Sequence, residues 1–213
     1  MPKYPRYQDY VIKNGRFVGE FEEMYRDFDD PWEQNTRESK LSYKAVVLFL
    51  LQKYKFNRVM EIGCGFGHFT NEINKLKIDT LGIDISETAI RKAAAQYPEC
   101  NFLCGDVLDF EIYEKFKPDC ILFSEVTWYI LDKLQDFIKY YKEIKYGEEV
   151  YLMHLLAMYA KGVQQYGTDY FSDLQGVLDY FDLDYEEYGQ ITYKELDGNS
   201  RTYFLGKPKA MRG

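Results

Sequence analysis

The chain has 213 residues, 46% of them hydrophobic and 18% aromatic, so it is long enough for one substantial core and too short for two ordinary domains. Its formal net charge of -8 gives a field that repels a phosphate backbone, which argues against a nucleic-acid partner. The longest apolar run, residues 45–51, ends at Gln52 and falls short of the roughly 20 residues that a membrane-spanning helix needs, so we expect no membrane span.

The N-terminal residues and the cysteines bear on the compartment. No apolar segment follows the first basic residues, which argues against a secretory signal. The four cysteines lack the two-residue spacing of a redox dithiol or a zinc knuckle. We therefore expect a cytoplasmic protein with reduced cysteines that pack as small apolar side chains, and we predict no metal site.

Residues 1–35 differ in kind from the rest of the chain. They interleave aromatic side chains with acidic ones and are too aromatic for a disordered tail. We predict an N-terminal arm that folds over the remainder of the protein, either as additional core or as a lid.

Residues 36–156 alternate short β-like runs with helical runs. A helix is expected over about 36–54, where apolar residues recur at helical spacing after a capping residue, Asn35 or Thr36. The strands expected after it are 58–62, 80–84, 101–103, 120–123 and 150–155, and the helices are 69–75, 89–96, 110–116 and 131–145. Such alternation predicts a parallel sheet with helices on both faces.

The last third of the chain departs from this alternation. Residues 157–182 form a predicted cap that contains a helix over 172–181. Residues 183–213 form a predicted hairpin, with strands over 185–195 and 201–204 joined by the turn residues 197–199. The prediction is therefore one α/β domain over 1–213, with a seven-stranded, mostly parallel sheet that ends in an antiparallel hairpin.

Three glycines mark a candidate ligand site. Gly63, Gly65 and Gly67 lie between a predicted strand and a predicted helix, where the backbone can turn tightly and approach a ligand. The dinucleotide pattern requires a small residue at the place of His68, which counts against a nicotinamide cofactor. The phosphate-loop pattern is also missing, because no Gly-Lys-Ser/Thr follows.

Two acidic residues follow the next two strands. Asp84 ends the second strand, where a carboxylate can accept both hydroxyls of a ribose. Asp106 follows the third strand and is an acceptor suited to an adenine amino group, beside the apolar Val107. In a parallel sheet these strand ends converge on one crevice, so we expect a nucleoside to bind there.

Four segments together carry a family resemblance. They are residues 61–67, 82–86, 105–107 and 119–126, and in order and spacing they are similar to the signature motifs of class I S-adenosylmethionine-dependent methyltransferases. The resemblance covers residues 36–156, the expected cofactor-binding core. It implies a Rossmann-like fold, S-adenosylmethionine as cofactor and S-adenosylhomocysteine as product.

The resemblance also implies roles for individual residues. Gly63, Cys64, Gly65 and Gly67 would line the methionine part of the cofactor, with Glu61 beneath this loop, where its charge suits the cationic ammonium and sulfonium groups. By the same resemblance Asp84 would take the ribose hydroxyls, Ile85 and Val107 would pack on adenine, and Asp106 would accept from the adenine amino group. Ser124 or Glu125 would border the methyl-donor end.

A narrower resemblance concerns Asp30-Pro31-Trp32 and residues 124–131. These segments are similar to nodulation-type N-methyltransferases, which act on chitooligosaccharides. If the likeness extends to function, Trp32 and its flanking helix close over the cofactor and the acceptor is linked to a glycan.

Methyl transfer is an in-line displacement, so the protein has to align the acceptor, exclude water and, where needed, take up a proton. Candidates for the base at the ends of the fourth and fifth strands are Glu125, Tyr129 and His154. Each has an alternative: Glu125 as an orienting group, Tyr129 as packing and His154 as a hydrogen-bonded core residue. We expect His68 to cap its helix or face solvent.

The sequence thus predicts an enzyme that methylates an oxygen or nitrogen of a small polar or glycan-linked acceptor, in cell-surface polysaccharide modification. A secondary-metabolite methyltransferase and a catalytically silent S-adenosylmethionine-binding protein are the alternatives. The acceptor, the choice between nitrogen and oxygen, and the oligomeric state stay open.

Overall fold

A computed structural model describes residues 2–32, 43–144, 149–159, 166–192 and 199–210. The predicted capping residues Asn35 and Thr36, the first part of the predicted helix 36–54 and most of the turn 197–199 lie outside these ranges.

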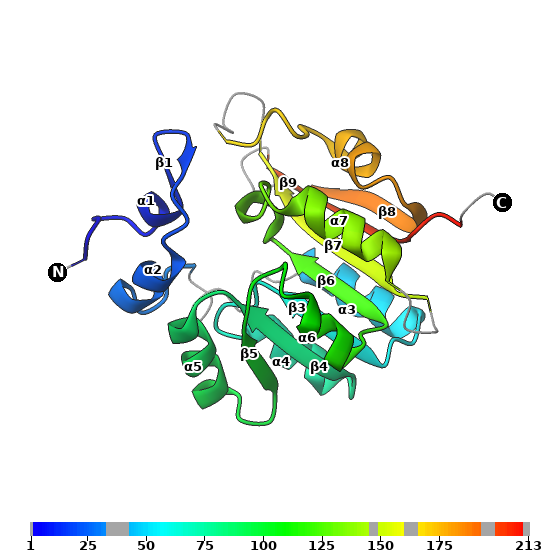
Figure 1. Cartoon of the computed structure of the whole chain (residues 1–213), viewed down its shortest axis with the longest axis horizontal. Coiled ribbons are helices and arrows are strands. Elements are labelled where there is room, and N and C mark those ends of the chain that lie inside the picture. Colours follow the sequence, from blue (N-terminus) through cyan, green and yellow to red (C-terminus); the bar gives the residue numbers. More distant parts are fainter. Residues whose placement is uncertain (1, 33–42, 145–148, 160–165, 193–198, 211–213) are drawn as a thin grey trace.

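The core of the fold is a seven-stranded sheet in the order β5-β4-β3-β6-β7-β9-β8 (Figure 1). Its strands are β3 (Arg58–Ile62), β4 (Asp79–Asp84), β5 (Asn101–Cys104), β6 (Cys120–Ser124), β7 (Tyr151–Met158), β8 (Asp184–Thr192) and β9 (Ser200–Lys207). Strands β3 to β7 run parallel, whereas β9 is antiparallel to both β7 and β8. The predicted Rossmann-like α/β fold with its antiparallel C-terminal pair is confirmed.

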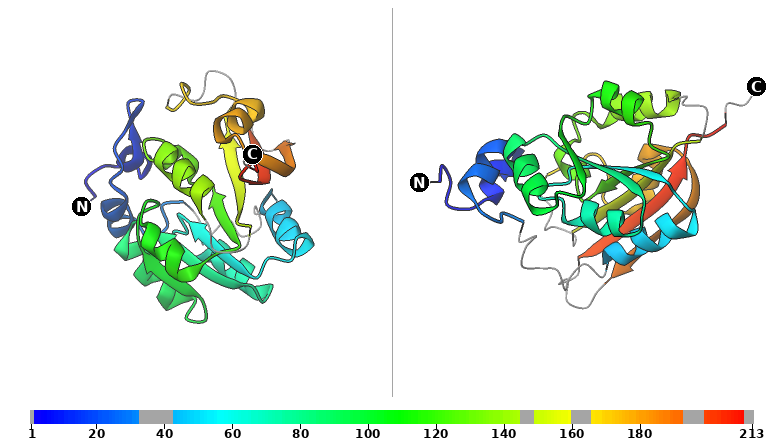
Figure 2. Two further views of the ribbon diagram at one scale, coloured as in Figure 1. Left: turned by 45° about the vertical axis from the view of Figure 1, so that its right-hand side comes forward. Right: turned by 90° about the horizontal axis from the view of Figure 1, so that it is seen from below.

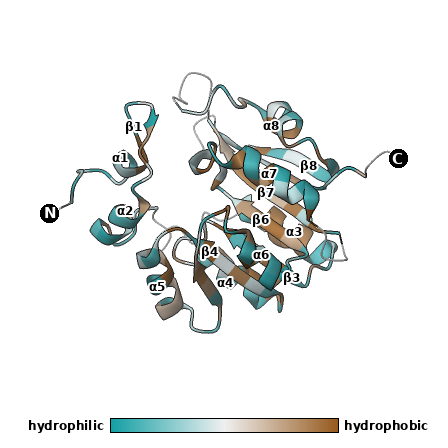
Figure 3. Ribbon diagram, viewed as in Figure 1, coloured by the Kyte–Doolittle hydropathy of each residue, from teal (hydrophilic) through white to brown (hydrophobic). Residues whose placement is uncertain are grey.

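Helices cover both faces of the sheet, as Figure 2 shows. They are α3 (Ala45–Lys53), α4 (His68–Lys75), α5 (Glu87–Gln96), α6 (Phe110–Phe116), α7 (Leu134–Glu143) and α8 (Leu174–Phe181). Side chains alternate between the faces along each strand, so β6 sends Ile121 and Phe123 toward α7 and Leu122 toward α3. Both faces are therefore buried, and in Figure 3 the central strands are coloured as hydrophobic.

The start of α5 follows directly from its sequence, whereas the start of α7 differs from the prediction. Ser86 caps α5, because its hydroxyl accepts a hydrogen bond from the Ala89 backbone N–H at 3.1 Å. The predicted helix 131–145 is shorter in the structure, since the 3-10 turn η2 (Thr127–Tyr129) and a further turn precede α7.

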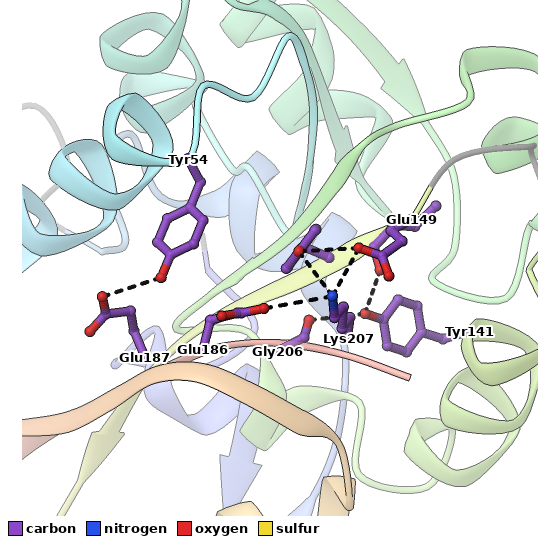
Figure 4. A network of polar contacts seen from close by, with 9 residues as sticks. Tyr54, Tyr141, Glu149, Glu186, Glu187, Gly206 and Lys207 are labelled. Atoms are coloured by element: carbon purple, nitrogen blue, oxygen red, sulfur yellow. Dashed lines mark hydrogen bonds and ion pairs between the residues drawn. The ribbon is translucent and has the colours of Figure 1, made fainter. Parts of the chain in front are cut away.

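A buried tyrosine ties α7 to the C-terminal part of the sheet. The Tyr141 hydroxyl lies against the carbonyls of Val150, at 2.8 Å, and Gly206, at 3.1 Å (Figure 4). More exposed side chains surround this contact, including Lys207, which pairs with Glu149 at 2.9 Å. One interior hydroxyl thus joins a helix to the ends of two strands.

We expect Tyr141→Phe to lower the free energy of unfolding by about 1–2 kcal/mol, because buried carbonyls lose a donor. Urea denaturation measures this change. Tyr151→Phe is the matched control: its hydroxyl reaches Glu149 at 3.4 Å on the exposed side, and we expect a loss below about 0.5 kcal/mol. Equal losses in the two variants would contradict this role for Tyr141.

The N-terminal arm, residues 2–32, is a small folded unit. It contains α1 (Gln8–Val11), the strands β1 (Ile12–Lys13) and β2 (Arg16–Phe17), and α2 (Phe21–Asp27). Its apolar residues form their own cluster, which also takes in Phe66 and Ala89 of the core. In Figure 1 the arm, in blue, lies beside α5 and the ends of the parallel strands.

One carboxylate of the arm docks it on α5. Glu22 accepts hydrogen bonds from the hydroxyls of Ser86 and Thr88, both at 2.6 Å, and from the Thr88 backbone N–H at 3.1 Å. A carboxylate at this end of α5 also interacts favourably with the helix dipole. Lys92 adds a hydrogen bond from the core side to the Tyr25 carbonyl, at 2.9 Å.

We expect Glu22→Gln to weaken this docking by about 1–2 kcal/mol, because the helix end loses a charged acceptor. Hydrogen exchange of the α2 amides should speed up, while exchange in β6 should not change. Glu23→Gln makes the same change of charge one residue away and should leave the α2 amides near the wild-type rate. An equal increase in the exchange of the α2 amides in both variants would contradict this role for Glu22.

Candidate functional site

A cavity of about 790 Å³ opens at the carboxyl ends of the parallel strands and extends under the arm. It lies where the sheet order reverses, with β4 on one side of β3 and β6 on the other, which is the usual ligand position in open α/β sheets. Its lining includes eleven of the fourteen predicted site residues: Trp32, Glu61, Gly63, Cys64, Asp84, Ile85, Asp106, Val107, Ser124, Glu125 and Tyr129. Gly65 and Gly67 belong to the same loop, between the lining residues Cys64 and His68, but are not themselves part of the lining.

The glycine loop is held in a conformation that side chains resist. Gly63, Gly65 and Gly67 have φ angles of 74°, 55° and 76°. A Cβ on Gly63 would lie 2.5 Å from Val126 Cγ2, and one on Gly67 would lie 2.4 Å from Phe102 Cζ. The loop therefore needs glycine both for its backbone angles and for its close packing.

Glu61 lies under this loop and is almost fully buried, with 2% of its surface exposed. Its Oε2 accepts a hydrogen bond from the Thr70 hydroxyl at 2.5 Å. Burial raises the pKa of Glu61, while the neighbouring Lys44 ammonium lowers it. A buried acid is thus placed beside the loop, as the sequence predicts.

Asp84 joins the loop to the next strand. Its Oδ2 accepts from the Gly65 N–H at 2.9 Å and its Oδ1 from the Ser86 N–H at 3.0 Å. Burial raises the pKa of Asp84 to about 6, although these N–H groups favour the ionised form. The following residue, Ile85, is 51% exposed and lines the cavity, so an apolar side chain is available there to pack on a ligand.

Asp106 and Val107 form the third strand end. Asp106 Oδ1 accepts from the Leu108 N–H at 3.0 Å, and Oδ2 forms an ion pair with Lys133. Val107 is buried and lines the cavity. The pairing with Lys133, which the sequence analysis missed, orients the Asp106 carboxylate.

Ser124 and Glu125 end β6. The Ser124 hydroxyl is buried and has no hydrogen-bond partner among the described residues. Glu125 has a φ angle of 65°, uncommon for a residue with a side chain, and its carboxylate accepts from the Ala157 N–H at 3.0 Å and pairs with Arg201. Burial raises the pKa of Glu125, whereas Arg201 lowers it.

Aromatic side chains of the arm and the core meet over the cavity. The Trp32 ring lies 5.5 Å from that of Tyr129 and 5.1 Å from that of Tyr7, and its indole N–H donates to the Tyr25 hydroxyl at 3.1 Å. Burial raises the pKa of Tyr129 well above its usual value, so its hydroxyl stays protonated. Trp32 and Tyr129 therefore share one wall.

The prediction that His154 reaches the acceptor is wrong in its geometry. Alternation along β7 turns this residue to the face under α8, where its ring stacks 4.7 Å from Phe204 and its Nε2 lies 2.8 Å from the Thr127 hydroxyl. It is fully buried and is absent from the cavity lining. Burial lowers its pKa to about 3, so it is a neutral core histidine.

His68 begins α4 and lines the cavity, and its Nδ1 lies 2.6 Å from the Tyr97 hydroxyl. The position at which α4 packs closely on β5 and α5 is Gly67, the residue before His68, because a Cβ on Gly67 would meet Phe102 and Ala93. The His68 side chain therefore does not obstruct this packing.

Several lining residues were not anticipated from the sequence. They are Tyr43, Lys44, Lys133 and Arg201. They come from the residues just before α3, the segment before α7 and the start of β9. No local pattern marks them as site residues, although Tyr43 and Lys44 lie within the predicted helix 36–54.

The residues present fit S-adenosylmethionine. Gly63 of the glycine loop and the Asp84 carboxylate line the cavity, and Asp84 is the kind of acceptor that ribose hydroxyls require. Ile85 and Val107 supply apolar side chains of the kind that an adenine ring requires. The Ser124 hydroxyl, which has no hydrogen-bond partner within the described part of the chain, is available to a polar group of a ligand.

Residues 59–145 match a family described as a methyltransferase domain. A phosphoethanolamine N-methyltransferase of Triticum aestivum is 31% identical over 90 residues, which is 40% of this chain and 18% of that protein. A dTDP-3-amino-3,4,6-trideoxy-alpha-D-glucopyranose N,N-dimethyltransferase of Streptomyces venezuelae is 31% identical over 74 residues, 33% of this chain and 30% of that protein. This chain thus spans less than a third of either relative's length.

Among solved structures, the N-methyltransferase NodS of Bradyrhizobium japonicum WM9, in complex with S-adenosyl-L-homocysteine, superposes with a TM-score of 0.67 at 19% identity. The match covers 92% of this chain and all of that one, and it shows a common fold. The methyltransferase domain matched over residues 59–145, the sheet order and the glycine loop agree with one another and support a class I S-adenosylmethionine-dependent methyltransferase.

Proposed function

We propose that this protein transfers a methyl group from S-adenosylmethionine to a nitrogen or oxygen atom of a small polar or glycan-linked acceptor, in cell-surface polysaccharide modification. The observation that carries the proposal is the continuous cavity. Its lining includes both the strand ends at which we propose that the cofactor binds and a set of aromatic and charged side chains: Tyr7, Tyr43, Tyr129, Tyr159 and the Glu125–Arg201 pair. Aromatic faces with hydroxyls suit a polar acceptor that also has apolar surface.

Nitrogen is the preferred acceptor atom in this proposal. The two curated relatives and the NodS structure are named as N-methyltransferases, and one relative is named for an amino sugar. A secondary-metabolite acceptor remains the second candidate. A cytoplasmic location is part of the proposal, in keeping with the four free cysteines.

The cofactor, when bound, supplies a methyl carbon on a cationic sulfur. In the proposal Gly63, Gly65 and the nearby backbone hold its methionine part, Asp84 its ribose and Asp106 the adenine amino group. Ser124 borders the methyl-donor end. The arm excludes water from this end through Trp32, and its role as a lid belongs to the same proposal.

Glu125 is the proposed proton acceptor. Its carboxylate lines the cavity beside Tyr129, and burial raises its pKa, which makes it a better base than an exposed glutamate. Arg201 and the Ala157 N–H hold the carboxylate in place. Tyr129, with its hydroxyl protonated, donates a hydrogen bond to the acceptor.

Thermal shift with S-adenosylhomocysteine and with NADH tests the cofactor part. Stabilisation by NADH and not by S-adenosylhomocysteine would overturn it. Radiolabelled S-adenosylmethionine with a panel of amino sugars, sugars, small amines and phenols then tests the transfer. Tight cofactor binding with no labelled product would favour a catalytically silent binding protein.

A further inference from the structure

Two basic and two acidic side chains of the cavity lining interact electrostatically with one another: Lys44, Glu61, Glu125 and Arg201. Arg201 is satisfied by direct contact with Glu125, and its guanidinium also lies 4.8 Å from the Tyr43 ring centroid. The charge of Arg201 is thus already compensated within the protein.

Lys44 is placed differently. It directly precedes α3, and its Nζ lies 4.4 Å from the ring centroid of Phe69, in the first turn of α4 behind the glycine loop. Burial lowers the pKa of Lys44, whereas attraction to Glu61 and Glu125 raises it. The Lys44 cation therefore lies near enough to Glu61 and Glu125 to be attracted by both, and it lines the same cavity as they do.

The remaining lysine of the lining is at another strand end. Lys133 forms an ion pair with Asp106, next to Val107, where the adenine is expected. This leaves Lys44 as the cation beside Glu61 in the described lining.

The methionine part of the cofactor carries an ammonium and a carboxylate on one carbon. Transfer of either charge from water into a cavity is costly unless an opposite charge receives it. Glu61 supplies the negative charge under the loop, and Lys44 supplies the positive one beside it.

We infer that Lys44 binds the carboxylate of the cofactor, so that Lys44 and Glu61 together recognise the methionine zwitterion. The inference rests on the proposed function, and it names a cofactor-binding residue outside the signature motifs. It also assigns α3 a role in positioning the cofactor.

The test compares two nucleotides that differ in one group: S-adenosylmethionine and its decarboxylated form, which lacks only the carboxylate. The two tryptophans of the chain, Trp32 and Trp128, both line the cavity, so their fluorescence reports binding directly. The wild-type protein should bind S-adenosylmethionine about 10- to 100-fold more tightly than the decarboxylated form. Lys44→Met should erase this preference by weakening S-adenosylmethionine alone.

Two further variants are controls. Lys44→Arg keeps the charge and should keep most of the preference. Lys53→Met, at the other end of α3, removes an equal charge from a surface ion pair with Glu187 and should change neither affinity.

Three results would overturn the inference: equal wild-type affinities for the two nucleotides, an unchanged preference in Lys44→Met, or loss of the preference in Arg201→Met but not in Lys44→Met. If Lys44→Met binds neither nucleotide, Lys44→Arg decides: a retained preference supports the inference and a lost one overturns it. If the wild-type protein binds neither, the proposed function itself fails.

Discussion

Asp84→Asn is expected to weaken the binding of S-adenosylhomocysteine by about 100-fold. In the proposed site the carboxylate accepts both ribose hydroxyls, and an amide replaces one charged acceptor by a donor. Two weakened hydrogen bonds to a charged group amount to about 3 kcal/mol, which is about 100-fold in affinity. Isothermal titration calorimetry measures the change.

The pH dependence of binding is a second signature of Asp84. Burial places its pKa at about 6, and the nearby Glu22 carboxylate adds to this increase. The ionised form binds the ribose, so affinity should fall as the pH drops through 6, to about one tenth of its neutral value at pH 5. Asp84→Asn should lose this dependence.

Two variants make the Asp84 experiment specific. Glu22→Gln removes the facing carboxylate of the arm and should move the midpoint to lower pH, because a like charge is gone. Asp79→Asn, at the opposite end of the same strand, should bind as the wild type does. A midpoint that persists unchanged in Asp84→Asn would assign the titration to another group.

Gly63→Ala is expected to lower the free energy of unfolding by about 2–5 kcal/mol and to abolish measurable binding of S-adenosylhomocysteine. The backbone there has a φ angle of 74°, and a Cβ would overlap Val126 Cγ2 at 2.5 Å. Strain of about 1–3 kcal/mol adds to an overlap of similar size. Because domains of this kind have only about 5–15 kcal/mol of stability, urea denaturation should reveal the change.

A second substitution separates the two causes. Val126→Ala removes the Cγ2 methyl that would lie 2.5 Å from a Cβ on Gly63, and it leaves the Val126 Cβ at 2.9 Å. The double variant Gly63→Ala/Val126→Ala should therefore regain part of the overlap energy and keep the backbone strain, so it should lose less stability than the two single losses added together. Purely additive losses would show that Val126 does not crowd this position.

The strand ends of the site could be predicted because each lies within a local pattern. Gly63, Asp84 and Asp106 follow apolar runs of strand length, and parallel strands bring their carboxyl ends to one edge. The exposed Ile85 beside the buried Asp84 agrees with this pattern. The position of these residues in the chain was enough to place them together, because each turn from a parallel strand to a helix starts at the same edge of the sheet.

His154 shows where such reasoning fails. Its apolar neighbours are compatible with either face of β7, and a shift of one residue turns a side chain from one face to the other. The register of β7 between β6 and β9 pairs His154 with Phe123 and Phe204. The stacked ring of Phe204, from far along the chain, therefore decided its environment.

The sequence by itself determined the α/β class, the glycine loop and the acids that follow the strands, since these depend on residues close in the chain. Only the tertiary structure decided which distant side chains complete the cavity: Lys44 from the start of α3 and Arg201 from β9. Their positions depend on the packing of α3 and on the antiparallel pairing of β9 with β7. The physical reason is that contacts between remote segments follow from burial and pairing summed over the whole fold, which no local spacing encodes.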